Sequence, residues 1–132
     1  GNGTPDDPHR LLPPAEVLYQ PGWRLVSYAA KWEPDHPAYA GTPTTCPADI
    51  SPKLAERLEE LGRPCAEAFG LTGYARMDVR LDARGEPHVL EVNPNPDLSE
   101  DAGFASTARA AGLSYEALLW EIVRLGRALG GR

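Results

Sequence analysis

Two acidic residues, an asparagine and an arginine lie in two short segments that both have the pattern of strands. Asp78 follows Arg76 by two residues, and Glu91 precedes Asn93 by two. Since strand residues two apart share a face, pairing the segments about their turn places Asp78 opposite Glu91 and Arg76 opposite Asn93. Carboxylate and amide oxygens are ligands of hard cations such as Mg²⁺. An arginine beside them can stabilise negative charge on a transferred group.

The alternative is a solvated hairpin face without chemistry. Like charges directly opposite each other destabilise a sheet, so Asp78 and Glu91 need a cation between them or a raised pKa. On a solvated face the acids would instead pair with Arg76 and Arg80. The residues alone leave both interpretations open.

The elements around this face follow from the hydrophobic pattern. Tyr74–Leu81 and His88–Asn93 are predicted strands, joined by a turn at Asp82–Glu86. The alternate positions of this hairpin should face the core; they are Met77, Val79, Leu90 and Val92.

Three helices are expected to pack against the sheet. Ser51-Pro52 is typical of a helix start, and Pro64 should kink that helix without dividing it. Its apolar stripe consists of Leu54, Leu58, Leu61, Cys65 and Phe69. Ser99 should begin the second helix and Gly112 end it, and Ser114 should cap the third. The apolar stripe of this third helix consists of Tyr115, Leu118, Leu119, Ile122 and Leu129.

The first half of the chain is less regular, with eleven of the fourteen prolines before residue 65. Ala15–Gln20 and Trp23–Tyr28 are short strand-like runs around Pro21-Gly22, whereas Lys31 to Pro47 shows no periodicity. Such a long aperiodic stretch is usually functional. The expected fold class is α+β, an antiparallel sheet built from the Ala15–Tyr28 segments and the hairpin, packed with about three helices.

Composition excludes several classes of function. The 132 residues contain 13 Lys and Arg against 19 Asp and Glu, a formal net charge of −6, which argues against a nucleic-acid partner. No apolar run is long enough to cross a membrane. Cys46 and Cys65 have no metal-site spacing and are expected to be free thiols in the reducing cytoplasm. The first residue is Gly rather than Met, and we expect the chain to be part of a longer one.

The segments Gly73–Val79 and Val89–Pro94 resemble the C-terminal half of the ATP-grasp fold, and most closely its D-alanine–D-alanine ligase branch. The thirteen-residue interval from Asp78 to Glu91 and the Glu-x-Asn ending carry the resemblance. Ala30-Lys31-Trp32, Cys46-Pro47-Ala48 and Ala111–Tyr115 extend it over about Leu12 to Leu125.

The resemblance implies a cofactor set and a reaction. Asp78, Glu91 and Asn93 match ligands of Mg²⁺, with two ions holding the phosphates of ATP. Arg76 matches the residue that stabilises the tetrahedral intermediate. Lys31 matches a lysine at the γ-phosphate, at the start of a mobile loop over residues 31–47. The implied enzyme is an ADP-forming ligase that activates a carboxylate as an acyl phosphate and joins it to an amine, with amino acids as substrates.

Three departures qualify this implication. Asp97 follows Pro96 where the family usually has Pro-Gly, and Ala102 stands where a serine grips the second substrate. The third and largest departure is that the chain covers only part of the family's architecture, whereas Trp32 in place of a more usual tyrosine is a mild change. On this interpretation residues 1–132 are the C-terminal part of one ATP-grasp domain. The substrate domain and the adenine-binding part are absent, so the isolated piece is inactive.

Other interpretations remain. A non-catalytic binding or scaffold module could keep the fold without the reaction, and a Mg²⁺-dependent phosphatase could use the same acids. A homo-oligomer could cover an apolar surface left by the missing part.

Overall fold

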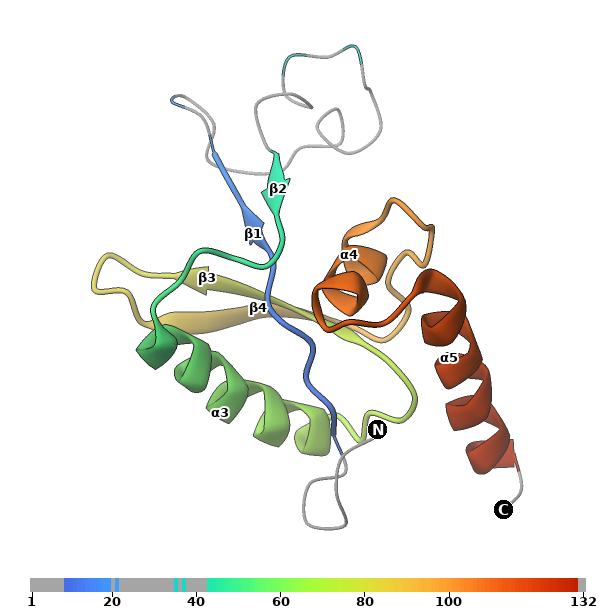
Figure 1. Ribbon diagram of the computed structural model, residues 1–132. Coiled ribbons are helices and arrows are strands. Elements are labelled where there is room, and N and C mark those ends of the chain that lie inside the picture. The colour runs from blue at the N-terminus through green and yellow to red at the C-terminus, as the bar shows by residue number, and fades with distance from the viewer. Residues whose placement is uncertain (1–8, 20, 22–34, 36, 38–42, 131–132) are drawn as a thin grey trace.

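A two-stranded hairpin crosses the centre of the described chain, with helices on either side (Figure 1). The computed structural model describes residues 9–19, 21, 35, 37 and 43–130. β3 (Arg76–Leu81) pairs antiparallel with β4 (Pro87–Asn93). A second, much shorter ladder joins β1 (Glu16–Val17) to β2 (Thr44–Thr45).

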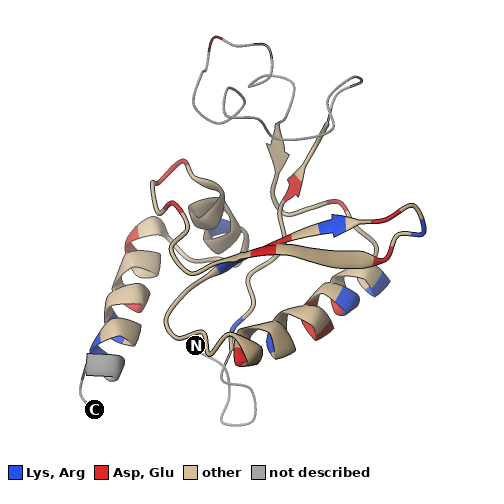
Figure 2. Ribbon diagram, turned by 180° about the vertical axis from the view of Figure 1, so that it is seen from behind, with Lys and Arg blue, Asp and Glu red and all other residues tan. Residues whose placement is uncertain are grey.

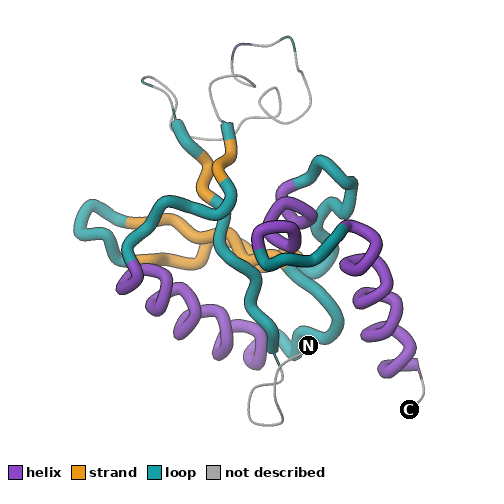
Figure 3. The backbone as a smooth tube through the Cα atoms, viewed as in Figure 1, coloured by secondary structure: helices purple, strands orange, loops and turns teal. Residues whose placement is uncertain are grey.

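The described strands therefore form two separate two-stranded sheets (Figure 3). The expected single sheet was wrong for β1, since this strand hydrogen-bonds to β2 and not to the hairpin. The predicted strand Trp23–Tyr28 lies outside the described residues. Antiparallel pairing and three helices confirm the α+β class for the described part of the chain.

The helix α3 (Pro52–Ala68) runs along one face of the hairpin (Figure 1). The Ser51 hydroxyl oxygen accepts the Leu54 N–H at 3.2 Å, so the predicted N-cap is confirmed. Pro64 lies inside this one continuous helix. The predicted stripe is half-buried except for Phe69, which is 65% exposed because the helix ends before it. Charged residues of both signs follow the solvent side of α3 (Figure 2).

The helix α4 (Gly103–Ala110) begins later than predicted. Ser99 does not cap it, because its backbone N–H and its hydroxyl both donate to Asp97 Oδ1, at 2.9 and 2.6 Å. Local side-chain bonds of this kind compete with a helical start. Ala102 holds the N-cap position without a side-chain hydrogen bond.

The turn after α4 behaves as predicted. Gly112 has φ +81° and the Leu113 N–H donates to Ala108 O at 3.0 Å, which closes the helix end. The Ser114 hydroxyl accepts the Ala117 N–H at 3.1 Å and caps α5 (Tyr115–Gly130). None of the helices in the described ranges has the length and apolar character to cross a bilayer.

The most deeply buried side chains lie between α4 and α5. Ala105, Ala108 and Leu118 are 1%, 1% and 4% exposed. Half-buried apolar residues pack around them: Leu12, Phe104, Leu113, Tyr115 and Ile122. In the described part, the hydrophobic centre is therefore at the helical end rather than under the hairpin.

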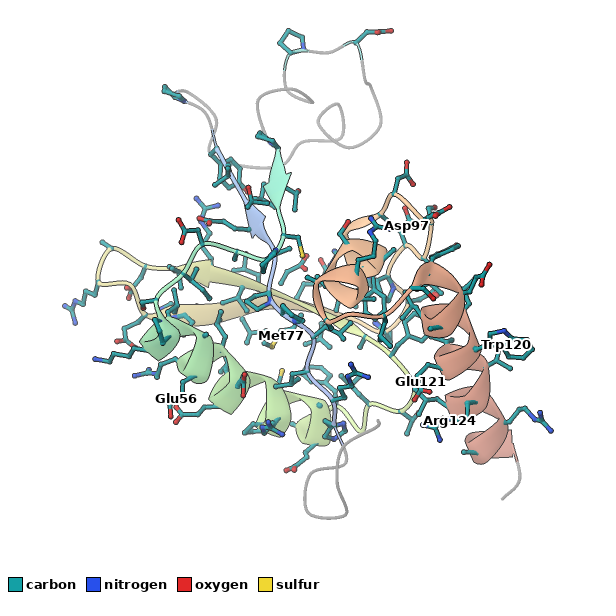
Figure 4. All side chains as sticks on the ribbon, viewed as in Figure 1. Glu56, Met77, Asp97, Trp120, Glu121 and Arg124 are labelled. Atoms are coloured by element: carbon teal, nitrogen blue, oxygen red, sulfur yellow. The ribbon has the colours of Figure 1, made fainter. Side chains whose placement is uncertain are left out.

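The hairpin meets α3 through a close approach at Gly62. An added Cβ there would lie 3.4 Å from Leu11 Cδ2 and 3.8 Å from Met77 Cε. Figure 4 shows the Met77 side chain between the hairpin and α3. The face of β3 that carries Met77 is therefore the inner face.

Candidate active site on the hairpin

The register of the hairpin brings four of the predicted site residues together. Arg76 pairs with Asn93 and Asp78 pairs with Glu91, as predicted. Because strand side chains alternate and Met77 points toward α3, these four side chains share the outer face of the hairpin. Their placement follows from backbone pairing alone.

Directly beyond this pair the ladder is irregular. Val79 pairs with Val89, which leaves Leu90 without a partner in a β-bulge. Leu90 is 67% exposed, so the prediction that it faces the core was wrong. Val89, which is half-buried, takes that inner position instead. The bulge therefore lies immediately beside the carboxylate of Glu91.

A positive group already contacts one of the two acids. Arg76 Nε donates to Asp78 Oδ1 at 2.6 Å and Arg76 Nη2 donates to Asp78 Oδ2 at 2.9 Å. This fork is the geometry in which arginine holds a carboxylate most firmly, although both side chains are partly exposed. The Arg76 pairing is also what the solvated-face interpretation expects. Arg80 lies with its guanidinium carbon 5.2 Å from the centre of the Tyr19 ring.

Asn93 is held from the loop that follows β4. The Asn95 N–H donates to Asn93 Oδ1 at 2.8 Å, and the Tyr74 hydroxyl donates to Asn95 Oδ1 at 3.2 Å. The Tyr74 ring packs edge-on against Phe104, with ring centres 5.6 Å apart. This series of contacts, which runs from the Phe104 ring through Tyr74 and Asn95, sets the direction of the Asn93 amide. Sequence reasoning missed Tyr74 and Asn95, although Asn-x-Asn is a spacing that favours such a turn.

The donor set suits a hard cation, but only in part. Asp78, Glu91 and Asn93 offer oxygen ligands on one face, and each oxygen that already accepts a hydrogen bond keeps a further lone pair. No group of three or more His, Cys, Asp or Glu side chains that could hold a metal occurs within the described residues. By themselves, these oxygens could fill only part of the ligand shell of a hard cation.

Lys31 lies outside the described residues, as does most of the predicted loop over 31–47. Residues 43–47 are described, and within them Thr44–Thr45 form β2. The end of the stretch that looked aperiodic is therefore tied by hydrogen bonds to β1.

The loop at Asp97 is organised by its own hydrogen bonds. Donation from the Ser99 hydroxyl and then from the Ser99 backbone N–H lowers the pKa of the Asp97 carboxyl below its ordinary value. This carboxyl occupies the turn that connects the hairpin to α4 (Figure 4). Cys46 and Cys65 are free thiols, as expected, and burial raises the pKa of Cys46.

Comparison with known proteins identifies the class to which this fold and this face belong. The sequence profile described as "D-ala D-ala ligase C-terminus" matches residues 4–124. The chain therefore belongs to the family of D-alanine–D-alanine ligase C-terminal domains, as the resemblance implied.

Individual relatives agree. A D-alanine–D-alanine ligase of Carboxydothermus hydrogenoformans is 33% identical over 127 residues, which are 96% of this chain and 37% of the relative. That of Haemophilus influenzae is 31% identical over 117 residues, 89% of this chain and 37% of the relative. An uncharacterized protein, y4sG of Sinorhizobium fredii, is 41% identical over 107 residues, 79% of this chain and 32% of the relative. The chain spans about a third of the length of these relatives.

Solved structures show the same fold. A D-alanine–D-alanine ligase from Bacillus anthracis in complex with ATP superposes with a TM-score of 0.63 at 28% identity, over 68% of this chain and 31% of that one. A second structure of a D-alanine–D-alanine ligase from that organism gives 0.65 at 25% identity, over 89% and 36%.

Proposed function

We propose that this chain is the C-terminal catalytic portion of an ATP-dependent, ADP-forming carboxylate–amine ligase, similar to D-alanine–D-alanine ligases. The observation that carries the proposal is the outer face of the hairpin, where the register gathers Arg76, Asp78, Glu91 and Asn93. Family membership supports it, since the relatives include D-alanine–D-alanine ligases and the Bacillus anthracis neighbour was solved with ATP.

Asp78, Glu91 and Asn93 would hold Mg²⁺ in this scheme, with two ions in the complete enzyme. The metal supplies neutralisation of the ATP phosphates during phosphoryl transfer to a substrate carboxylate. The Asn95 N–H keeps Asn93 Oδ1 oriented while one lone pair stays available.

Arg76 has two tasks in the proposed reaction. In the structure it neutralises Asp78. A cation held by Asp78, Glu91 and Asn93 would leave the Arg76 guanidinium available to a neighbouring reaction centre. There it would stabilise the negative charge that develops as the amine attacks the acyl phosphate. Lys31 would approach the γ-phosphate from the loop over 31–47.

The substrates are proposed to be a small carboxylate and an amine, with amino acids favoured. D-alanine as acceptor has less support, because Ala102 and Asp97 differ from the usual residues on that side. Asp97 lacks the backbone freedom of the usual Gly, and its carboxylate accepts hydrogen bonds from Ser99. The free thiols Cys46 and Cys65 suit a cytoplasmic protein.

We place residues 1–132 in the C-terminal part of one ATP-grasp domain and expect these residues by themselves to show no turnover. The chain matches 37% of each of the two ligase relatives. The remaining portion of such a ligase would supply the substrate domain and the adenine pocket.

The decisive experiment is Glu91→Gln in the complete ligase polypeptide that contains this chain. Replacing this charged metal ligand with a neutral amide should lower carboxylate-dependent ATP hydrolysis by on the order of 10³-fold, because metal ions supply several kcal/mol to such steps. Coupled measurement of ADP release is the assay. Undiminished turnover would sink the proposal.

A matched control is Glu86→Gln on the same hairpin. Glu86 lies at the turn and pairs with Arg57 at 2.6 Å, away from the four-residue face. Its loss should leave ADP release within about twofold of the parent, since exposed ion pairs contribute little.

A non-catalytic module is the second candidate, favoured by the closed Arg76–Asp78 fork. This candidate expects no Mg²⁺ binding by the hairpin. Titration with Mg²⁺ in the presence of ATP of the complete polypeptide that contains this chain, followed by the amide resonances of residues 76–93, separates the two, because the hairpin is proposed to supply only part of a metal shell. Shifts confined to the four-residue face, absent in Glu91→Gln, support the ligase; no shifts at millimolar Mg²⁺ support the module.

A further inference from the structure

The loop over residues 93–98, here called the post-hairpin loop, is held by two tyrosine hydroxyls. The Tyr74 hydroxyl donates to Asn95 Oδ1 at 3.2 Å, and the Tyr115 hydroxyl donates to Leu98 O at 3.0 Å. Tyr74 precedes the hairpin, whereas Tyr115 begins α5. Two segments that are far apart in the chain therefore hold one short loop.

Both tyrosines are attached to the buried cluster between α4 and α5. Tyr115 packs against that cluster directly. The Tyr74 ring lies edge-on to the Phe104 ring, with 5.6 Å between the ring centres, and Phe104 packs against the same cluster. Edge-on ring contacts are favourable and directional. The position of the post-hairpin loop is therefore set by the most buried part of the described chain.

The backbone of this loop has little freedom of its own. Asn93 precedes Pro94, and Asn95 precedes Pro96. A proline fixes its own φ and restricts the residue before it to extended conformations. Pro96 is also buried. A displacement at Asn95 should therefore be carried to Asn93 rather than absorbed between them.

Asn93 depends on the post-hairpin loop for the direction of its side chain. Pairing with Arg76 places Asn93 on the outer face of the hairpin but does not decide where its amide points. The Asn95 N–H donates to Asn93 Oδ1 at 2.8 Å. Because only the oxygen of an amide side chain can accept this bond, the bond also decides which end of the amide faces the loop. The same oxygen keeps a second lone pair for a cation.

We propose that Tyr74 and Asn95 are positioning residues for Asn93. The Tyr74 hydroxyl holds Asn95, and the Asn95 backbone N–H then holds Asn93 Oδ1 in a single orientation. This inference rests on the proposed function, in which Asn93 is a ligand of Mg²⁺. Partners that orient metal ligands through hydrogen bonds change metal affinity or activity by roughly 10- to 100-fold when they are mutated.

Metal affinity of the complete polypeptide that contains this chain tests the inference. Mn²⁺ is the probe, because it takes the oxygen ligands that suit Mg²⁺ and can be followed by electron paramagnetic resonance. ATP is present and the carboxylate substrate is left out. Tyr74→Phe should raise the dissociation constant of Mn²⁺ by on the order of tenfold. Asn95→Ala should act similarly, and the double variant should bind no more weakly than either single variant, because both changes break the same hydrogen bond.

A measurement without metal or nucleotide tests the orientation itself. In Tyr74→Phe the side-chain amide resonances of Asn93 should shift or broaden, because the amide can then take more than one orientation. Tyr115→Phe is the matched control, since it loses the same group and a hydrogen bond to the same loop, but at Leu98. It should leave the Asn93 resonances in place and the Mn²⁺ dissociation constant within about twofold of the parent. Circular dichroism should show that every variant is folded.

The inference and the proposed function fail in different ways. If Glu91→Gln and Asn93→Ala weaken Mn²⁺ binding but Tyr74→Phe does not, the inference is overturned and the proposed function stands. Additive losses in the double variant, or an equal loss in Tyr115→Phe, would also overturn the inference. If Mn²⁺ binding is indifferent to Glu91→Gln and Asn93→Ala, the proposed function fails. The metal-free Asn93 resonances then still decide whether Tyr74 orients the amide, and unchanged resonances in Tyr74→Phe would show that it does not.

Discussion

The hairpin and the helix pair α4–α5 are stabilised in different ways. No residue of β3 or β4 is fully buried, and the hairpin is held by its ladder, by its turn and by contact with α3. The α4–α5 pair contains the buried side chains Ala105, Ala108 and Leu118. Among the described residues, those that could do chemistry are on the hairpin, and the most buried side chains are on the helix pair.

This division means that the geometry of the candidate site depends on main-chain pairing rather than on close packing. Side chains on the outer face of the hairpin can therefore change without loss of the core. Such changes are expected to weaken ligand binding and turnover. Changes between α4 and α5 are instead expected to lower the free energy of unfolding. The same variants measured for both properties should separate the two regions.

The largest stability effect is expected for Leu118→Ala. Leu118 is 4% exposed in the buried cluster, so truncation leaves a cavity and should lower the free energy of unfolding by about 2–4 kcal/mol. Urea denaturation followed by circular dichroism measures this. Leu90→Ala is the control in the hairpin, where 67% exposure limits the loss to about 0.5 kcal/mol. Equal losses of unfolding free energy at Leu118 and Leu90 would contradict the difference between the helix pair and the hairpin.

A smaller effect is expected for Arg76→Gln. The variant removes the two hydrogen bonds to Asp78, but both side chains are partly exposed. The free energy of unfolding should fall by only about 0.2–1 kcal/mol, since solvent screens such pairs. If the complete protein is the proposed ligase, the same variant should lose at least about 10²-fold in kcat, because the proposed role of Arg76 is to stabilise charge in the transition state. A large fall in the free energy of unfolding without a loss of kcat would mean that Arg76 has a structural role and not a catalytic one.

The smallest effect concerns pH and the hairpin turn. Hydrogen bonds from the backbone N–H of Glu86, then of Arg84, and then from His88 lower the pKa of Asp82 below its ordinary value of 3.8. A lowered folded-state pKa stabilises the fold above the unfolded value and loses that contribution as the pH falls through the folded value. Asp82→Asn should therefore show a smaller drop in Tm between about pH 5 and about pH 2.5 than the parent. Identical drops in Tm for the parent and the variant would show that Asp82 does not contribute to the pH dependence of stability.

Local signals in the sequence predicted several parts of this structure well. Ser51 and Ser114 cap helices and Gly112 adopts positive φ, because each feature depends on residues within one turn. Symmetry about the hairpin turn predicted that Asp78 lies roughly opposite Glu91, and the one-residue bulge at Leu90 makes that pairing direct. These are short-range effects that residue type and spacing determine.

The errors arose where two local preferences compete. Ser99 had the residue type of a cap, but Asp97 two residues earlier engages both of its donors. Leu90 had the position of a core residue, but the bulge displaced it. The partnership of Tyr74 with Asn95 spans 21 residues and depends on how the loop folds back, so alternation alone does not indicate it.

The bulge has a consequence for the length of the hairpin. A strand normally tolerates no deletion beside a site, because every side chain beyond it turns to the opposite face. Leu90 is the residue without a partner, so a chain that lacks it would still pair Asp78 with Glu91 and Val79 with Val89. Of all positions in β4, Leu90 is therefore the one whose deletion need not turn the residues on either side of it to the opposite face.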